Sequence, residues 1–146
     1  DPKFQVLRSY ITLIWKHMKS FNNYSFLIAD YHSVIRYGIT KIIKNSLKNI
    51  SIYESDTIVD TFKILKETRI DFMILGVNFP ETDGVISVVD IKKMQPGIKI
   101  LIFSDYNKDI YEKRYLNAGA FLYMNKISGV EEIKLTLKNM IVLGQN

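Results

Sequence analysis

Short apolar runs alternate with segments of helical period along most of the chain, and this alternation restricts the fold more than any other feature. Four runs are almost continuously apolar, as in strands buried on both faces, and a fifth alternates apolar and polar residues. The expected strands are 26–29, 50–53, 72–75, 98–103 and 121–124. Five strands alternating with five helices predict right-handed crossovers, and therefore a doubly wound α/β fold with a parallel sheet covered on both faces.

The predicted helices are recognised by the spacing of their apolar residues and by their terminal residues. Ile35, Ile39, Ile42 and Ile43 follow the i, i+4, i+7, i+8 pattern of one buried helical face. Ser55 or Asp56 is expected to cap the next helix, which has its apolar face at Ile58, Phe62 and Leu65. Further helices are expected at about 85–94, 108–117 and 133–141, the second of them ending at Gly119 in a left-handed C-cap.

Composition excludes several classes of protein. The 146 residues suit one compact domain, and the absence of cysteine excludes disulfide scaffolds, thiolate metal sites and cysteine nucleophiles. The net charge is +5, but the basic residues are scattered among acids, which argues against a nucleic-acid-binding face. Since no apolar run approaches the roughly 20 residues of a membrane span, we expect a cytoplasmic protein without membrane contact.

Residues 1–17 stand apart from this pattern and are expected to be an N-terminal extension or an added leader. Met18 is a candidate native start, so the predicted division is 1–17 and a domain at 18–146. Without the first segment the net charge falls to +3.

Polar residues follow four of the predicted strands. They are Asp30-Tyr31, Gly76 with its loop, Ser104-Asp105 and Asn125-Lys126. Because ligands of open parallel sheets bind outside the carboxyl ends of the strands, this edge is the candidate site.

Two segments resemble a known family. Residues 26–39 (FLIADYHSVIRYGI) resemble the start of a two-component response-regulator receiver domain, in the variant typical of LuxR/FixJ-type regulators. Residues 71–84 resemble the phosphorylation segment, with its Pro-x-x-Asp-Gly loop at 80–84. The resemblance implies a flavodoxin-like fold with strand order 2-1-3-4-5. It also implies a switch hydroxyl at Ser104, a switch aromatic residue at Tyr123 and the family's invariant lysine at Lys126.

The departures from the family pattern concern its chemistry. Gly76 stands where the family has the aspartate that accepts a phosphoryl group, and Tyr31 replaces the second acid of the first strand. Only Asp30 and the backbone carbonyl of Asn78 remain of the expected Mg²⁺ ligands. We therefore predict lost or weak Mg²⁺ binding, no other cofactor, no catalytic residue and no enzymatic activity.

Several residues have structural roles as the simplest expectation. Lys126 is expected to pair with Asp30, and Ser104 to be an ordinary strand-end hydroxyl. Gly76 is either a flexible strand end or a gap that admits the ring of Tyr31. His17 and His32 are expected to face solvent, without a metal.

Function is expected to be that of an atypical receiver domain, independent of phosphorylation, that regulates transcription by binding a protein partner or a second copy. We also expect a residual interaction with a histidine kinase. DNA binding is expected only through a separate LuxR-type output domain. The candidate contact surface comprises Tyr111, Arg114, Tyr115, Tyr123, Lys134 and Lys138. The alternative is a sensor in which Ser104, Lys126 and the amides near Gly76-Val77 bind a small molecule or anion.

Overall fold

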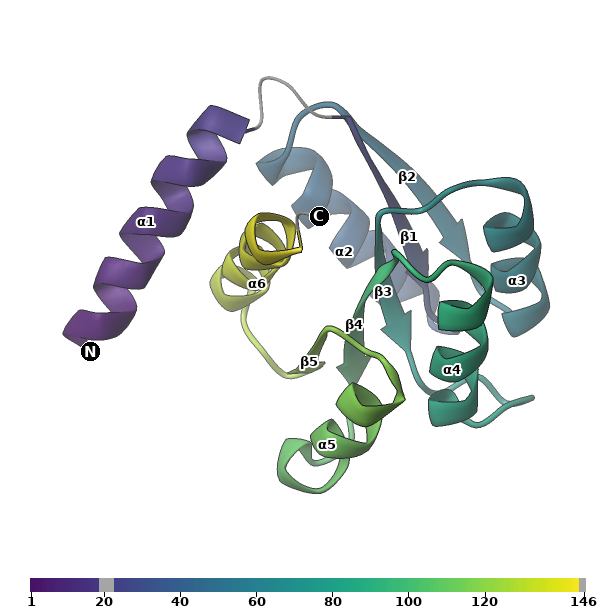
Figure 1. Cartoon of the computed structure of the whole chain (residues 1–146). Coiled ribbons are helices and arrows are strands. Elements are labelled where there is room, and N and C mark those ends of the chain that lie inside the picture. The colour runs from purple at the N-terminus through teal and green to yellow at the C-terminus, as the bar shows by residue number, and fades with distance from the viewer. Residues whose placement is uncertain (19–22, 145–146) are drawn as a thin grey trace.

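A five-stranded parallel sheet forms the centre of the molecule. The computed structural model describes the backbone of residues 1–18 and 23–144, and the side chains of 1–14 and 23–144. The strands are β1 (Tyr24–Ala29), β2 (Ile50–Ser55), β3 (Phe72–Gly76), β4 (Lys99–Ser104) and β5 (Leu122–Asn125). Their order is β2-β1-β3-β4-β5, as predicted, and every neighbouring pair is parallel (Figure 1).

Helices cover both faces of this sheet. They are α2 (Ser33–Ser46), α3 (Ile58–Glu67), α4 (Gly84–Met94), α5 (Lys108–Ala118) and α6 (Val130–Leu143). Alternate strand residues point to opposite faces. Leu27, Met73 and Ile100 thus belong to the core beneath α3, α4 and α5, whereas Phe26, Ile74 and Leu101 belong to the core beneath α2 and α6. The predicted fold class is confirmed.

A sixth helix precedes the sheet, so the expected count of five helices was wrong. This helix, α1 (Pro2–Met18), packs against α6, with Ile11 only 4% exposed (Figure 1). Its described apolar residues spread over about half of the helix circumference, so they extend well beyond the part that contacts α6. None of the helices in the described part of the chain is long and apolar enough to cross a membrane.

The start of α3 and the end of α5 test the cap residues that were expected from the sequence. The N-cap of α3 is Thr57, whose hydroxyl accepts a hydrogen bond from Asp60 N at 3.0 Å, so Ser55 and Asp56 were wrong as cap residues. Ser55 cannot serve because β2 extends through it and its buried hydroxyl contacts Thr61 Oγ1 at 2.7 Å. Gly119 ends α5 with φ of 120°, which confirms the expected left-handed position. The expectations for His17 and for Met18 as a start lie outside the described side chains.

Candidate functional site

The carboxyl ends of β1, β3, β4 and the loop after β5 bring together Asp30, Gly76, Ser104 and Lys126. The strand register sets Ala29 beside Leu75, Gly76 beside Phe103, and Ser104 beside Asn125. Lys126 continues this ladder, since its backbone N donates to Ser104 O at 2.9 Å. The edge of the sheet identified from sequence therefore gathers the predicted residues.

A buried ion pair occupies the centre of this edge. Lys126 Nζ lies 3.0 Å from Asp30 Oδ2, and the two side chains are 6% and 3% exposed. Asp30 Oδ1 accepts a hydrogen bond from His32 N at 2.8 Å, while Asp30 Oδ2 and Lys126 Nζ have no further partner among the described residues. The predicted Asp30–Lys126 pair is present, and each of its charges depends on the other for compensation.

Gly76 gives the Asp30 carboxylate its space. A Cβ atom at position 76 would lie 2.2 Å from Asp30 Oδ2 and 2.7 Å from Asp30 Cγ. Gly76 is a strand end, as one expectation had it, since β3 ends there. The other expectation, a gap that admits the ring of Tyr31, was wrong because Asp30 occupies the gap. Tyr31 does not enter it: its side chain is 51% exposed and its ring packs edge-on against exposed His32, at 5.4 Å between centroids.

Arg36 fixes the backbone beneath the ion pair. Its guanidinium donates to Asp30 O at 2.8 Å and lies 3.6 Å from the Glu54 carboxylate on β2. In the sequence, Arg36 was only part of segment 26–39, which carries the family resemblance, and had no role of its own. The signal that could have identified it is a basic residue in the first turn of the helix that follows the strand-end acid.

Ser104 and Tyr123 form an inward-facing pair on β4 and β5. Ser104 is fully buried, and its Oγ accepts a hydrogen bond from Tyr106 N at 2.9 Å. Tyr123 is 5% exposed and donates its hydroxyl to Tyr106 O at 2.9 Å. Burial raises the pKa of Tyr123 above its ordinary value, and the neighbouring Ser104 side chain partly opposes this effect.

Two of the residues proposed for a contact surface are therefore inside the molecule. Tyr115, 4% exposed, packs its ring against Tyr123 at 5.9 Å, and burial raises its pKa to about 12. Tyr115 and Tyr123 were wrong as interface residues, because each stands on the side of its element that faces the core. Arg114 is exposed and Tyr111, Lys134 and Lys138 are half-buried, so they remain candidates.

The residues expected to supply Mg²⁺ ligands at this edge, Asp30 and Asn78, make contacts with other groups. Both Asp30 oxygens are engaged, one by Lys126 and the other by His32 N. Asn78 is half-buried and its side-chain amide makes only a long contact, 3.5 Å, to Asp105. No group of three or more metal-ligating side chains occurs among the described residues.

Comparison with known proteins identifies the family. A family model described as the response regulator receiver domain matches residues 26–138. This chain belongs to that family. The receiver domain is 26% identical to the response regulator GacA of Pseudomonas aeruginosa over 114 residues, 78% of this chain and 53% of GacA. It is 27% identical to the Fimbriae Z protein of Escherichia coli K12 over 109 residues, 75% of this chain and 52% of that protein.

Solved structures share the fold. A two-component response regulator from Clostridium difficile superimposes with a TM-score of 0.77 at 18% identity, over 85% of this receiver domain and 100% of that chain. The isolated receiver domain of RcsB from Salmonella enterica, in the presence of phosphomimetic BeF₃⁻, gives 0.76 at 19% identity, covering 86% and 92% of the two chains. The chain spans about half the length of the curated relatives it matches.

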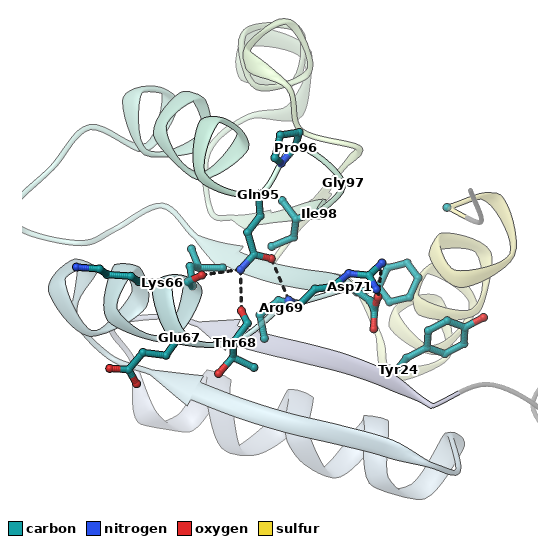
Figure 2. Close-up of a pocket in the computed structure, with 14 residues that line it drawn as sticks. Tyr24, Lys66, Glu67, Thr68, Arg69, Asp71, Gln95, Pro96, Gly97 and Ile98 are labelled. Carbon is teal, nitrogen blue, oxygen red and sulfur yellow. Dashed lines mark hydrogen bonds and ion pairs between the residues drawn. The ribbon is translucent and has the colours of Figure 1, made fainter.

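A second polar region of the receiver domain lies at the opposite, amino-terminal edge of the sheet. A cavity of about 510 Å³ opens there between the loops before β3 and β4, and Phe72 is among its lining residues. Figure 2 shows Tyr24 at one side of it. Its rim carries both charge signs, from Lys66, Glu67, Arg69 and Asp71.

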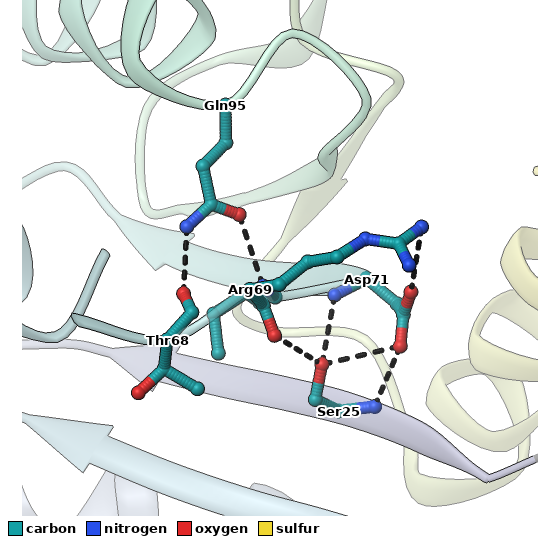
Figure 3. Close-up of polar contacts among 6 residues, drawn as sticks. Ser25, Thr68, Arg69, Asp71 and Gln95 are labelled. Carbon is teal, nitrogen blue, oxygen red and sulfur yellow. Dashed lines mark hydrogen bonds and ion pairs between the residues drawn. The ribbon is translucent and has the colours of Figure 1, made fainter. Parts of the chain in front are cut away.

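Figure 3 shows how side chains close this edge. The Gln95 amide nitrogen donates to Thr68 O at 2.7 Å, as Figure 3 shows. The same nitrogen donates to Leu65 O at 2.7 Å, and the Gln95 oxygen accepts from Ile70 N at 2.9 Å. Ser25 N donates to the Asp71 carboxylate at 2.9 Å, and Ser25 Oγ accepts from Asp71 N at 3.0 Å. These bonds satisfy backbone groups of the loop between α3 and β3. The cluster therefore connects β1, β3 and the end of α4, and its role is structural. Sequence reasoning missed it because side-chain bonds between distant loops leave no local pattern.

Proposed function

We propose that this protein is an atypical receiver domain that works without phosphorylation. The observation that carries the proposal is the Asp30 carboxylate lying against Gly76, at the position where the family resemblance places the phosphoacceptor aspartate. Gly76 offers no nucleophile, and a side chain there would collide with Asp30. The acid that remains is committed to Lys126 and is not available to a metal ion.

The Asp30 carboxylate takes the place beside Lys126 that a bound anion would occupy. In an anion site, Lys126 would need an unneutralised ammonium directed at the anion. Here its counter-ion is built into the chain, at 3.0 Å. This favours a fixed receiver domain over the alternative of a small-molecule or anion sensor at the same edge.

The inward position of Tyr123 supports a single preset state. Its hydroxyl is bonded to Tyr106 O and its ring is buried beside Tyr115. Because the switch hydroxyl Ser104 already accepts a bond from Tyr106 N, the two residues assigned to switching are held by the protein alone.

The expected output is contact with a protein partner or a second copy. The remaining candidate surface is the exposed side of α5 and α6, with Tyr111, Arg114, Lys134 and Lys138; the Arg114 guanidinium lies 5.5 Å from the Tyr111 ring centre. Tyrosine and arginine are enriched at interfaces. One protein of similar fold, from Aurantimonas, is a two-component response regulator of the LuxR family. We extend this to the present chain as a cytoplasmic regulator of transcription, with DNA binding by a LuxR-type output domain and a residual histidine-kinase contact.

Phosphorylation chemistry tests the proposal directly. The full chain is treated with Mg²⁺ and acetyl phosphate, and separately with Mg²⁺ and beryllofluoride, and followed by intact mass and amide NMR spectra. We expect neither a phosphoryl adduct nor saturable shifts around Asp30, Ser104 and Lys126. A stoichiometric acid-labile adduct refutes the proposal. Heat on titration with inorganic phosphate alone, lost in Lys126→Met, would instead establish the anion sensor.

A further inference from the structure

The N-terminal helix α1 presents apolar side chains on a face that nothing in the described structure covers. Its inner face packs on α6 through Ile11, and the exposed Phe4 and Arg8 line a hollow on that side with Leu135 and Asn139. Its outer apolar face, defined by Val6, Tyr10, Leu13 and Ile14, follows helical spacing on another side of the helix. These four side chains are 56%, 62%, 60% and 41% exposed.

The concentration of exposed apolar residues in α1 is unusual for this molecule. Six of the nineteen large apolar side chains that are exposed in the described residues fall within residues 1–14. Isolated exposed apolar residues need no explanation, but a contiguous row marks a contact surface.

The charges of α1 indicate which surface it fits. Lys3, Arg8 and Lys16 are its charged residues, and it contains no aspartate or glutamate, Asp1 standing just before it. Pairing with a second copy of α1 would bring like charges together, whereas an anionic surface would attract them. An apolar face on a helix with only basic charges is typical of helices that lie in the interface plane of a bilayer.

We infer that α1 docks this receiver domain on an anionic lipid surface, with its outer apolar face in the boundary between headgroups and acyl chains. No described helix is long and apolar enough to cross a membrane, and α1 carries polar and basic side chains along its length, so the inferred position is in the plane of the membrane surface. Figure 1 places α1 beside α6 and away from α3, α4 and α5, so this orientation leaves most of the domain free for a protein partner. The sequence expectation of no membrane contact considered only spanning segments, and this inference does not depend on the proposed function.

Vesicle flotation of the full chain tests the inference. We expect the protein to float with vesicles of phosphatidylcholine containing about 30% phosphatidylglycerol, but not with phosphatidylcholine alone, and to be released by high salt. Leu13→Glu should weaken vesicle binding by about tenfold or more, because it adds a charge to the outer apolar face. Val59→Glu, which makes a similar change at a 70% exposed site on α3, is the matched control and should bind as the wild type does.

Three results overturn the inference. The first is no flotation with either vesicle, and the second is equal binding by Leu13→Glu and the wild type. The third is a wild-type dimer in sedimentation velocity that Leu13→Glu converts to a monomer without any lipid binding, which would assign the face to a second copy. Circular dichroism confirms that each variant is folded before it is scored.

Discussion

Replacing Lys126 with methionine should cost more stability than any change of an exposed lysine. Lys126→Met retains a similar volume but leaves the Asp30 carboxylate, 3% exposed, with a single hydrogen bond from His32 N. Breaking a buried ion pair by removing one partner costs about 3–5 kcal/mol, because a buried charge is left uncompensated. That is a large share of the roughly 5–15 kcal/mol that holds a typical domain folded.

Urea unfolding followed by far-ultraviolet circular dichroism measures this loss, with the slope of the transition checked for constancy. Lys113→Met, on the exposed side of α5, is the matched control and should change the free energy of unfolding by less than about 0.5 kcal/mol. The double variant Asp30→Asn, Lys126→Met removes both charges and should be far more stable than the sum of the two single losses predicts. If Lys126→Met lowered the free energy of unfolding by less than about 1 kcal/mol, or if the double variant were simply additive, the two charges would not depend on each other for compensation. Either result would refute the interpretation.

Two further changes test the surroundings of this pair. Gly76→Ala should destabilise the domain by about 1–3 kcal/mol in urea unfolding, because its Cβ would lie 2.2 Å from Asp30 Oδ2. Gly38→Ala, within α2 and with open space around it, should be neutral or stabilising, and an equal response of both variants would contradict the steric explanation. Tyr115 has its pKa raised to about 12 by burial, so stability should be retained below pH 10 and fall as the pH rises from 10 toward 12, by at most about 3 kcal/mol in total. Tyr115→Phe should lose less stability across that window than Tyr37→Phe, a 65% exposed control, and parallel pH profiles would exclude Tyr115 as the cause.

The sheet could be predicted from the sequence because buried parallel strands leave a strong local pattern. The run at 98–103 is apolar wherever both faces are covered, and the strand that it indicates, β4, is buried from Ile100 to Ser104. The shared edge was also predictable, since strand ends in such a sheet converge there. The pairing of Asp30 with Lys126 at that edge followed from the family resemblance, in which the lysine pairs with an acid of the pocket.

The errors arise where a three-dimensional neighbour decides the outcome. Thr57 caps α3 because β2 extends further than its apolar pattern suggests. Tyr123 and Tyr115 resemble surface tyrosines in sequence, but their rings face each other in the core. The helix α1 was missed because residues 1–17 precede the alternation of strands and helices and were assigned to an extension.

Gly76, Asp30 and Lys126 depend on one another, and this dependence limits what a single substitution can restore. Gly76→Asp would supply a carboxylate, yet its Cβ would meet Asp30 Oδ2 and place two carboxylates side by side over one lysine. Asp30 would have to rotate out of its pair, and Tyr31 would still provide no second acid for Mg²⁺. Gly76→Asp alone should therefore remain unreactive toward acetyl phosphate, whereas Gly76→Asp combined with Tyr31→Asp provides three carboxylates at one edge. Phosphoryl transfer to each variant is measured by intact mass. Equal rates in the single and double variants would show that Asp30 can leave Lys126 readily, and would contradict the argument that the ion pair holds Asp30 in place.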